Sequence, residues 1–587
     1  MINPRKAITE MQEYNPPTSN REEFLRLDFN ESTIGCSTNV IKALSKIKTR
    51  NLATYPEYTK LRKILSNYCN VSIEEIIATN GTDEAIKTII ESYIEKGKDE
   101  IIIPVPTYAM FKFYAQLNEA IIKEIEYNQD LSFPTEKVLE AINKKIKIII
   151  LVNPNNPTGT SIKRKDIIKI VEKAKKNDAI VLIDEAYYQF YGKTSVSLIK
   201  KYDNLFVTRT FSKAFGLAGL RLGYIISNKD NLNIIQKVLS PYSVNNLAIV
   251  CASAALGDLD YIKNYAQEAK KSKLILYKEL EKLGVKYYKS DANFILLSIG
   301  PQSAKFCQKL REKGILVRDR GSDILLNGCV RITLGTLKQT KELIKAFRQV
   351  IKEINPLLIF DIDGVLVDVS KSYRVAVKKT SEYFTKKEIN FEKIQSYKNK
   401  GRLNNDWDLT ESIIKDKGIV ADKKLIIRKF QSYYNKLRNN EKWILNNKLL
   451  KKLSDRYYLA ILTGRPKNEA YYVLNKNKVA NYFRTIIAME DVSKQKPNPK
   501  GLMKILSQFS NSEAYYFGDS IDDMGASVLA NVTPVGVLPP QDKSTFLLNL
   551  LIKNGAKFVI TDINNIMEAL KWGLQKYQGK PKKLRLN

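Results

Sequence analysis

Short apolar runs alternate with helix-length amphipathic segments along almost all of this chain, and this alternation constrains the fold more than any other feature of the sequence. Between residue 61 and about residue 245, the apolar runs are residues 76–79, 101–103, 148–152, 180–183 and 205–207. Continuous β-branched runs are typical of strands buried on both faces, and helices between them are typical of βα units. The sequence therefore predicts an α/β protein with a mostly parallel sheet covered by helices.

The pattern changes after residue 245, where long helical segments precede short strands around residues 294–297 and 330–333. This order predicts a smaller α+β lobe of the same domain. A helical segment over residues 337–354 stops at Asn355-Pro356, because the residue before a proline disfavours the helical conformation. An apolar strand over residues 357–360 follows at once, so we place a domain boundary here, between residues 1–355 and 356–587.

The second half repeats the strand–helix alternation at residues 458–462, 485–487 and 514–517. This repetition predicts a second α/β domain of Rossmann type. A helical block of about residues 371–445 interrupts the pattern after the first strand. An insertion at that position predicts a helical cap over an active site.

Composition restricts the classes of function. The formal charge is +34, but the basic residues are spread through every segment and no nucleic-acid module accompanies them, so we expect a solvated basic surface and no nucleic-acid partner. No apolar run approaches the roughly 18 residues of a membrane span, and we expect a protein without membrane contact. Five cysteines without a Cys-x-x-Cys pair are typical of reduced thiols, which predicts a cytoplasmic location.

Histidine is absent from the chain. Its absence removes the usual acid–base residue of neutral pH and the commonest metal ligand. Any chemistry must therefore use Lys, Asp, Glu, Tyr, a cofactor or an oxygen-bound metal.

The first half carries separated motifs that together match the needs of one cofactor. They are Asn80-Gly81-Thr82-Asp83, Pro106-Thr107-Tyr108, residues 153–159, Asp184-Glu185-Ala186-Tyr187 and residues 210–221, which include Lys213. They supply an amine that can bond a cofactor, an acid for a ring nitrogen, donors for a ring oxygen and a helix N-terminus for a phosphate. A single lysine is usually a solvated one, but the ordered set indicates a pyridoxal 5'-phosphate enzyme.

On these motifs, residues 1 to about 354 resemble the fold-type I aminotransferases, in particular the histidinol-phosphate aminotransferases. The resemblance implies that Lys213 bonds the cofactor and shuttles a proton, and that Asp184 pairs with the ring nitrogen. It implies cofactor contacts also for Asn156 and Tyr187 at the ring oxygen, Tyr108 on the ring face, and Gly81, Thr82, Thr210, Ser212 and Arg221 at the phosphate. Tyr55 would reach in from a second subunit, which implies a homodimer.

The resemblance also implies substrate contacts for Tyr14, Asn30, Arg318 and Arg331. The two guanidinium groups match family positions that hold a substrate phosphate and carboxylate, although either could instead form a surface ion pair. Ser32-Thr33 replaces the usual Asn-Pro of the family after Asn30-Glu31. This departure leaves the threonine-phosphate decarboxylases and the aromatic aminotransferases open.

The second half carries four further motifs in order: Asp361-x-Asp363-Gly364, Thr463-Gly464-Arg465, Lys496-Pro497 and residues 518–523, which include Asp519 and Asp523. The first places two carboxylates at the carboxyl end of a strand, where open α/β sheets bind their ligands. Acidic turns are common, but four motifs in this order resemble the haloacid dehalogenase-type phosphatases over residues 357–575.

That resemblance implies a role for each motif. Asp361 would attack phosphorus, while Asp363 would protonate the leaving oxygen and then activate water. Mg²⁺ would bind Asp361, the Asp363 backbone and Asp519, with Asp523 in support, because this ion prefers oxygen ligands. Thr463 and Lys496 would hold the phosphoryl oxygens. A dehalogenase does not need the acid at residue 363, so the motif argues for a phosphatase.

Together the two halves predict a bifunctional enzyme of histidine biosynthesis. Amino transfer from glutamate to imidazole-acetol phosphate would give histidinol phosphate, and phosphate removal would then give histidinol. Known phosphatases of this superfamily that act on histidinol phosphate carry a Cys/His zinc loop, whereas this chain has no His and no Cys after Cys329. The alternatives are a phosphatase for another small phosphorylated metabolite and a regulatory module.

Overall fold

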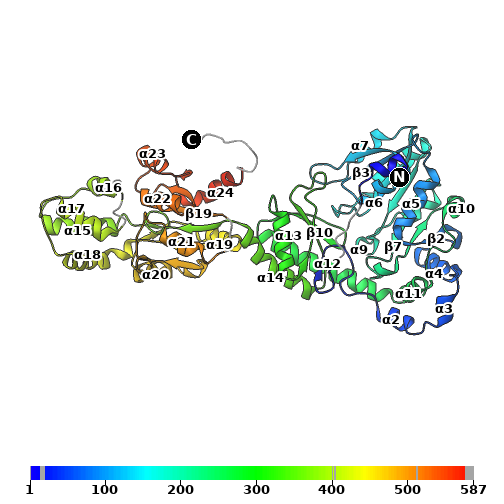
Figure 1. Cartoon of the computed structure of the whole chain (residues 1–587), viewed down its shortest axis with the longest axis horizontal. Coiled ribbons are helices and arrows are strands. Elements are labelled where there is room, and N and C mark those ends of the chain that lie inside the picture. Colours follow the sequence, from blue (N-terminus) through cyan, green and yellow to red (C-terminus); the bar gives the residue numbers. More distant parts are fainter. Residues whose placement is uncertain (1, 14–19, 399–400, 402–404, 510–512, 576–587) are drawn as a thin grey trace. The chain divides into compact units, whose positions relative to one another are not determined.

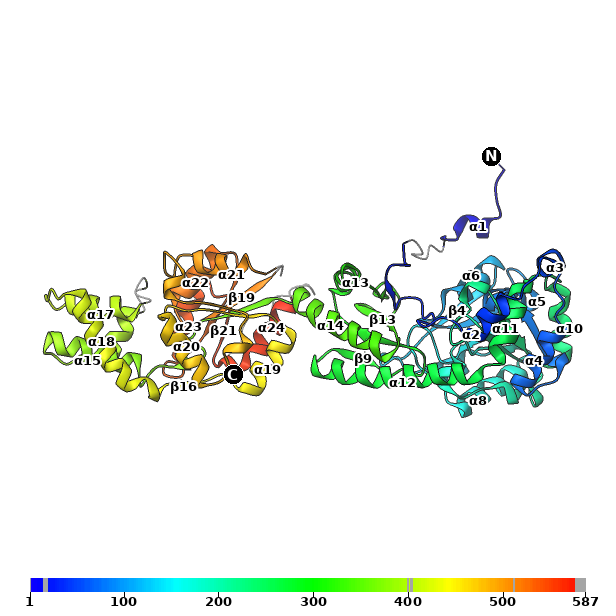
Figure 2. The ribbon, with the colours of Figure 1, turned by 90° about the horizontal axis from the view of Figure 1, so that it is seen from below.

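The computed structural model describes residues 2–13, 20–398, 401, 405–509 and 513–575 (Figures 1 and 2). The chain separates into two compact units, Met1–Phe347 and Arg348–Asn587, and helix α14 (Leu337–Ile354) crosses the boundary between them. Within the described ranges, no helix combines the length and the apolar character needed to cross a membrane.

The large sheet of the first unit has seven strands in the order β2-β8-β7-β6-β5-β3-β4. Their bounds are β2 (Ile76–Thr79), β3 (Glu100–Val105), β4 (Ile121–Glu126), β5 (Ile146–Val152), β6 (Ile180–Asp184), β7 (Leu205–Thr210) and β8 (Gly223–Ile226). The strands from β7 to β4 run parallel, while β8 is antiparallel to both of its neighbours. The sheet is therefore mixed, and all five predicted apolar runs form strands within it.

Side chains of the sheet alternate between two helix-covered faces. On β5, Ile148 and Ile150 pack into a cluster with α5, α6 and α10, whereas Ile149 and Leu151 pack on the opposite side with α4, α8 and α11. The helices on the two faces are α5 (Gly81–Tyr93), α6 (Ala109–Leu117), α10 (Lys229–Val238), α4 (Thr59–Cys69), α8 (Arg164–Lys176) and α11 (Asn246–Leu256). Each such side chain contributes roughly 1.5–3 kcal/mol relative to exposure, which explains the continuous apolar runs.

A smaller lobe completes the first unit. Its antiparallel sheet has the order β12-β13-β10-β9, with β9 (Lys286–Tyr288), β10 (Phe294–Ser298), β12 (Arg318–Asp319) and β13 (Cys329–Thr333). Helices α12 (Leu259–Lys282), α13 (Ser303–Glu312) and α14 belong to this lobe, where Phe306 packs edge-on against Phe347 at 4.9 Å between ring centroids. The expectation of a smaller α+β lobe is confirmed.

The other elements of the first unit are short. They are α1 (Lys6–Glu10), β1 (Leu25–Arg26), α2 (Thr38–Leu44), α3 (Thr49–Ala53), α7 (Thr135–Ala141), α9 (Tyr188–Tyr191) and β11 (Ile315–Leu316). β1 pairs in parallel with β11, which holds the N-terminal segment against the small lobe.

The second unit is built on a six-stranded parallel sheet in the order β18-β17-β14-β19-β20-β21. Its strands are β14 (Leu357–Phe360), β17 (Leu459–Leu462), β18 (Thr485–Ile487), β19 (Ala514–Gly518), β20 (Thr533–Val537) and β21 (Phe558–Ile560). The helices of this core are α19 (Asn447–Arg456), α20 (Lys467–Lys476), α21 (Lys500–Leu506), α22 (Ile521–Leu529), α23 (Thr545–Lys553) and α24 (Ile566–Gln575). This architecture confirms the expectation of a Rossmann-like domain.

A helical cap lies between the first two core strands in sequence. It comprises α15 (Tyr373–Thr385), α16 (Phe391–Lys398), α17 (Asp406–Lys415) and α18 (Lys423–Leu437), which Figure 1 shows grouped at one end of the unit. The two chain segments that join the cap to the core form a small antiparallel ladder of β15 (Val367–Asp368) and β16 (Lys442–Trp443). The ladder ties both connections together at the base of the cap.

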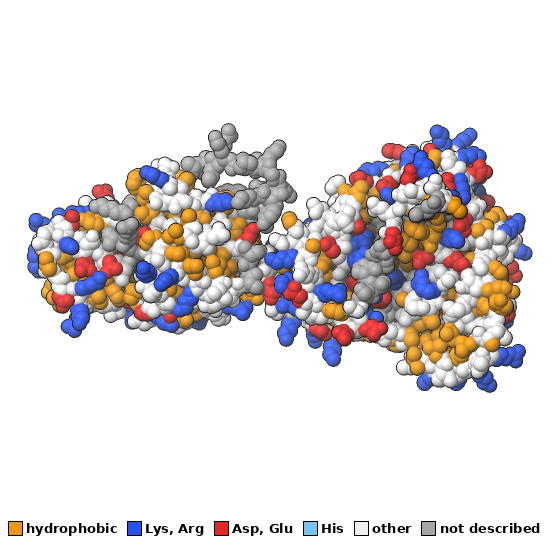
Figure 3. All heavy atoms as spheres, in the orientation of Figure 1, with side chains coloured by type: hydrophobic (Ala, Val, Ile, Leu, Met, Phe, Trp, Pro, Cys, Tyr) orange, Lys and Arg blue, Asp and Glu red, His pale blue; other side chains and the backbone are white. Residues whose placement is uncertain are grey.

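On the face shown in Figure 3, Lys and Arg side chains are dispersed over both units and interspersed with Asp and Glu side chains. Dispersal of this kind is typical of a solvated surface.

Candidate active sites

In the first unit, the carboxyl ends of β6 and β7 and the first turn of α5 surround a cavity of about 160 Å³. Asp184 is the last residue of β6, and Lys213 follows β7 within three residues. Nine residues predicted from the motifs line this cavity: Thr82, Tyr108, Asn156, Asp184, Tyr187, Thr210, Ser212, Lys213 and Arg221. Parallel strands thus bring separate motifs to one edge of the sheet.

Asp184 is buried, Lys213 is half-buried, and both have shifted pKa values. The Lys213 Nζ donates a hydrogen bond to the Phe29 carbonyl at 2.9 Å. Burial, with a contribution from the positive charge of Arg331, lowers the pKa of Lys213 to about 8. Burial raises the pKa of Asp184 to about 7, and its Oδ1 accepts from Thr208 Oγ1 at 3.2 Å. A buried carboxylate needs a cationic partner to stay ionised, and a protonated ring nitrogen meets that need.

The start of α5 provides an anion site. Gly81 has φ +71°, and a Cβ at this position would lie 2.7 Å from Nη2 of Arg221. Arg221 pairs with Asp83 at 2.9 Å, and the Ser212 backbone N–H donates to Thr210 Oγ1 at 3.0 Å. A 13-residue helix N-terminus, hydroxyl groups and a guanidinium together suit a phosphate. The donors present therefore fit pyridoxal 5'-phosphate.

A network of polar side chains connects the cavity to the N-terminal segment. Asn30 Nδ2 donates to Tyr187 Oη at 2.9 Å, and Arg331 donates to Asn156 Oδ1. Burial lowers the pKa of Arg331 to about 10. None of Asn30, Arg331 and Arg318 lines the cavity itself. Asn30 and Arg331 hydrogen-bond to residues that do, whereas the Arg318 guanidinium lies 5.7 Å from the ring centroid of Phe29. The structure thus brings Asn30 and Arg331 to the site and leaves Arg318 at its margin.

One predicted residue lies away from the cavity of its own chain, and the position of another is not described. Tyr55 is 78% exposed and stacks on Tyr242 at 4.4 Å between ring centroids, outside the cavity of its own chain. Tyr14 lies outside the described residues. The sequence motifs did not predict a role for Asp83. Its carboxylate accepts a hydrogen bond from Tyr108 Oη at 3.0 Å and forms an ion pair with Arg221. Asp83 belongs to the Asn80–Asp83 motif and lies in the first turn of α5. That position at the start of a helix is the sequence feature from which its role could have been predicted.

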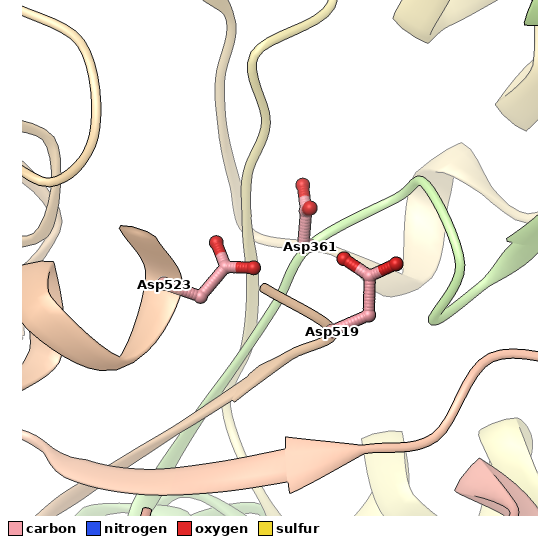
Figure 4. Close-up of side chains that lie close together, drawn as sticks. All are labelled: Asp361, Asp519 and Asp523. Atoms are coloured by element: carbon pink, nitrogen blue, oxygen red, sulfur yellow. The ribbon is translucent and has the colours of Figure 1, made fainter. Parts of the chain in front are cut away.

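In the second unit, three carboxylates converge beside the carboxyl ends of neighbouring strands β14 and β19. Oxygens of Asp361, Asp519 and Asp523 lie within 4.8 Å of one another, and Figure 4 shows the three groups directed to a common space. Asp361 follows β14, Asp519 follows β19, and Asp523 lies in the first turn of α22. At Gly364, which has φ +74°, a Cβ would overlap the Asp519 carboxylate. A side chain there would displace the Asp519 carboxylate.

One lysine faces this cluster. Lys496 Nζ lies 3.2 Å from Asp361 Oδ2 and 2.6 Å from Asp523 Oδ1. Asp523 also accepts from Tyr516 and Ser520, so both of its oxygens are engaged. By contrast, Oδ1 of Asp361 is buried without a hydrogen-bond partner within the described part of the chain.

The electrostatics of the cluster favour a bound cation. Burial raises the pKa of Asp361 well above its usual range and that of Asp519 to about 7. Lys496 is the cation in direct contact with Asp361 and Asp523 among the residues described, and the partnerless Asp361 oxygen offers a ligand atom. A hard divalent ion with oxygen ligands would offset the charge of the carboxylates. The residues therefore fit Mg²⁺.

Asp363 does not join the cluster through its side chain. Its Oδ1 accepts from Arg465 Nε at 2.7 Å, and Arg465 also pairs with Glu441 at 3.1 Å. Burial alone would lower the pKa of Arg465, but Asp363 and Glu441 together raise it. Glu441 directly precedes β16, so this network links the residue-363 loop to the base of the cap. The sequence analysis predicted no role for Arg465, although this residue belongs to the Thr463-Gly464-Arg465 motif, and no sequence motif contains Glu441.

Thr463 directly follows β17 and is buried. Its Oγ1 accepts a hydrogen bond from the Arg465 backbone N–H at 3.3 Å, and its own N–H donates to the Ile487 carbonyl at 3.0 Å. The residue is therefore fixed at the carboxyl edge of the sheet, on the strand next to β14.

Comparison with known proteins gives two family matches. Residues 22–347 match the family described as aminotransferase class I and II, and residues 358–537 match the family described as haloacid dehalogenase-like hydrolase. Among curated relatives, the histidinol-phosphate aminotransferase of Thermoanaerobacter sp. (strain X514) is 39% identical over 334 residues, which are 56% of this chain and 93% of the relative. That of Methanocaldococcus jannaschii is 36% identical over 342 residues, covering 56% and 90% of the two chains.

Solved structures show the same relationship for the first unit. The histidinol-phosphate aminotransferase from Clostridium acetobutylicum aligns with a TM-score of 0.52 and 26% identity, covering 56% of this chain and 98% of that one. The histidinol-phosphate aminotransferase from Sinorhizobium meliloti, in complex with pyridoxal-5'-phosphate, shares the fold with a TM-score of 0.54 and 23% identity, covering 59% and 96%. The chain therefore belongs to the class I and II aminotransferases and carries, in fusion, a C-terminal haloacid dehalogenase-like hydrolase domain.

Proposed function

We propose that this chain catalyses two consecutive reactions of histidine biosynthesis. The first unit would transfer an amino group from glutamate to imidazole-acetol phosphate, and the second would remove the phosphate of the resulting histidinol phosphate. One observation carries the proposal: relatives of the first unit bear the name histidinol-phosphate aminotransferase, and the product in that name is a phosphate ester. The fused domain has the carboxylate cluster suited to hydrolysing such an ester.

In the first unit, Lys213 would bond pyridoxal 5'-phosphate and move a proton at the substrate carbon, a role that its lowered pKa supports. Bound there, the cofactor would withdraw electrons from that carbon. Asp184 would hold the ring nitrogen in its charged form, Tyr108 would cover the ring, and Asn156 would contact the ring oxygen. Tyr187 would also contact the ring oxygen, and Gly81, Thr82, Thr210, Ser212 and Arg221 would hold the phosphate.

Substrate binding in this unit would use Arg318 and Arg331 for the substrate phosphate and carboxylate. Asn30 and Tyr14 would be further substrate contacts, and Tyr14 is outside the described residues. The burial of Arg331 and its hydrogen bond to Asn156 support a place at the reacting end of the cavity. Tyr55 would complete the cavity of a second copy in a homodimer. Its exposure and its distance from its own cavity support that assignment.

In the second unit, an oxygen of Asp361 would attack phosphorus as the ester P–O bond breaks, and Asp363 would give a proton to the departing alcohol oxygen. Water would then attack the phosphorylated Asp361, give a proton to Asp363 and release inorganic phosphate. Asp361, Asp519 and the Asp363 backbone would hold Mg²⁺, with Asp523 in support, and Thr463 and Lys496 would bind phosphoryl oxygens. Arg465, which lies 2.6 Å from Asp363 Oδ1, would hold the Asp363 side chain in position for both proton transfers.

The test is one reaction mixture followed over time. The purified chain is combined with imidazole-acetol phosphate, glutamate, pyridoxal 5'-phosphate and Mg²⁺, and histidinol phosphate, histidinol and inorganic phosphate are measured by mass spectrometry and phosphate assay. We expect histidinol from the unaltered chain and accumulated histidinol phosphate from Asp361→Asn. The matched variant Lys213→Ala should form neither product but should still hydrolyse added histidinol phosphate.

Each half of the proposal can fail separately. Histidinol phosphate without phosphate release would refute the substrate proposed for the second unit. Absence of amino transfer, with intact hydrolysis of added ester, would refute the substrate proposed for the first.

A further inference from the structure

The cap forms one wall of a cavity of about 50 Å³ beside Asp361 and Asp519. Arg374 of α15, Gln395 and Lys398 of α16 contribute to this wall. A space of this size suits a phosphoryl group, so the organic part of an ester would extend into a neighbouring space.

Arg374 stands at the exit from this cavity. It is only 7% exposed, its Nη1 donates to Gln395 Oε1, and its Nε has no hydrogen-bond partner among the residues described. None of the carboxylates in the described ranges forms an ion pair with it. A buried guanidinium N–H without an acceptor is costly, and a phosphoryl group in the cavity that Arg374 lines would supply the missing acceptor.

A groove of about 670 Å³ opens on the other side of Arg374 and Gln395, which line both spaces. Its volume is within the roughly 300–1,000 Å³ of small-molecule sites. Two aromatic side chains line it: Phe391 at the start of α16 in the cap, 46% exposed, and Phe546 of α23 in the core, 63% exposed. Two exposed phenylalanines in one groove, one from each part of the unit, mark a surface suited to a planar apolar group.

The charged residues of the groove indicate the charge of its occupant. Glu392 and Asp542 line it, and Arg374 is the cation at its inner end. With Arg374 directed to the phosphoryl group, the two carboxylates remain to face the organic part. A positively charged group would be attracted there and an anionic one repelled.

We propose that this groove is the leaving-group subsite of the hydrolase and that it takes the aromatic, amine-bearing part of a phosphate monoester. The ring packs between Phe391 and Phe546, the ammonium group lies near Glu392 and Asp542, and Arg374 contacts the phosphoryl oxygens. The inference rests on the phosphatase activity proposed above and adds the substrate class that the second unit selects. Histidinol phosphate belongs to this class.

Three esters separate the contributions of ring and charge: histidinol phosphate carries both, 2-phenylethyl phosphate carries the ring alone, and ethanolamine phosphate carries the amine alone. They are tested on the full chain with Mg²⁺, with the double variant Phe391→Ala/Phe546→Ala and with Arg374→Met. Leu425→Ala removes an equally exposed apolar side chain of the cap outside the groove and serves as the control.

We expect the double variant to lower kcat/KM about 10- to 100-fold for the two ring-bearing esters and less than about threefold for ethanolamine phosphate, because aromatic contacts contribute roughly a factor of 10 each. Arg374→Met should lower kcat/KM for all three. Free histidinol should inhibit hydrolysis of ethanolamine phosphate, and the double variant should need about tenfold more of it. Unchanged tryptophan fluorescence shows that the second unit of a variant has folded, because all three tryptophans lie in that unit.

Equal losses on all three esters in the double variant, or no loss on any, would overturn the inference while leaving the phosphatase function in place. An unaltered chain that hydrolyses none of the three, nor p-nitrophenyl phosphate, would instead refute the phosphatase function itself, and the subsite with it.

Discussion

Replacement of Arg465 by methionine should destabilise the second unit by about 3–5 kcal/mol. The Arg465 and Glu441 side chains are each 1% exposed and lie 3.1 Å apart, so the substitution leaves a buried carboxylate without its partner. Removing one member of a buried ion pair costs roughly 3–5 kcal/mol, mainly for that unpaired charge. Asp363, whose side chain is 25% exposed, can recover some hydration and adds less.

The cost should fall when the second charge is removed as well. In Arg465→Met/Glu441→Gln no full charge remains buried in the pair, so the double variant should be more stable than the sum of the two single losses predicts, by about 1–3 kcal/mol. Lys423→Met breaks an exposed pair with Asp408 and should cost less than about 1 kcal/mol.

Denaturant unfolding followed by tryptophan fluorescence measures these values in the full chain. All three tryptophans, Trp407, Trp443 and Trp572, lie in the second unit, so the signal reports that unit alone. A loss below about 1 kcal/mol for Arg465→Met, or strict additivity of the two substitutions, would refute the reasoning that Arg465 compensates a buried charge.

Three further predictions concern cofactor and metal. Because burial lowers the pKa of Lys213 to about 8, the rate of pyridoxal phosphate uptake by apoprotein, followed by visible absorbance, should rise with pH up to about 8 and then level off; a continued rise to pH 10 would indicate an ordinary lysine. Gly81→Ala should weaken cofactor binding at least tenfold in equilibrium dialysis, since its Cβ displaces the Arg221 guanidinium, whereas Gly97→Ala, with similar φ but open space, should leave binding unchanged. Removal of divalent metal with a chelator should abolish phosphate release without affecting amino transfer, and added Mg²⁺ should restore it; metal-independent hydrolysis would contradict the cation site.

The sequence predicted the buried strands well because burial on both faces leaves a continuous apolar run. The run at residues 148–152, which lies within β5, is an example. The end of α14 was also predicted, because Pro356 disfavours a helical conformation at Asn355. The sequence did not predict β4, an edge strand that mixes three Ile with three charged side chains and so has no continuous apolar run. Nor did it predict the antiparallel β8, whose direction depends on how residues 211–222 return the chain.

For the candidate sites, motif order identified the residues that meet at strand ends, including Asp184 with Lys213 and Asp361 with Asp519. It could not predict the contacts made across the cap. The ion pair of Arg465 with Glu441 and the position of Arg374 at the cavity exit depend on how an inserted helical block folds back on the core. No local pattern encodes that placement, because the partners lie in different motifs and elements.

The position of β14 at the centre of its sheet has a consequence for synthesis of the chain. This strand leaves the ribosome first among the strands of the second unit, yet Leu358 pairs with Leu459 on one side and Tyr515 on the other. Both partners are translated much later, after the whole cap, and closing such long loops is slow. The first unit can fold while the second is still being synthesised, but β14 stays unpaired during that time. Its apolar side chains must therefore be protected from aggregation until residues beyond 514 have left the ribosome.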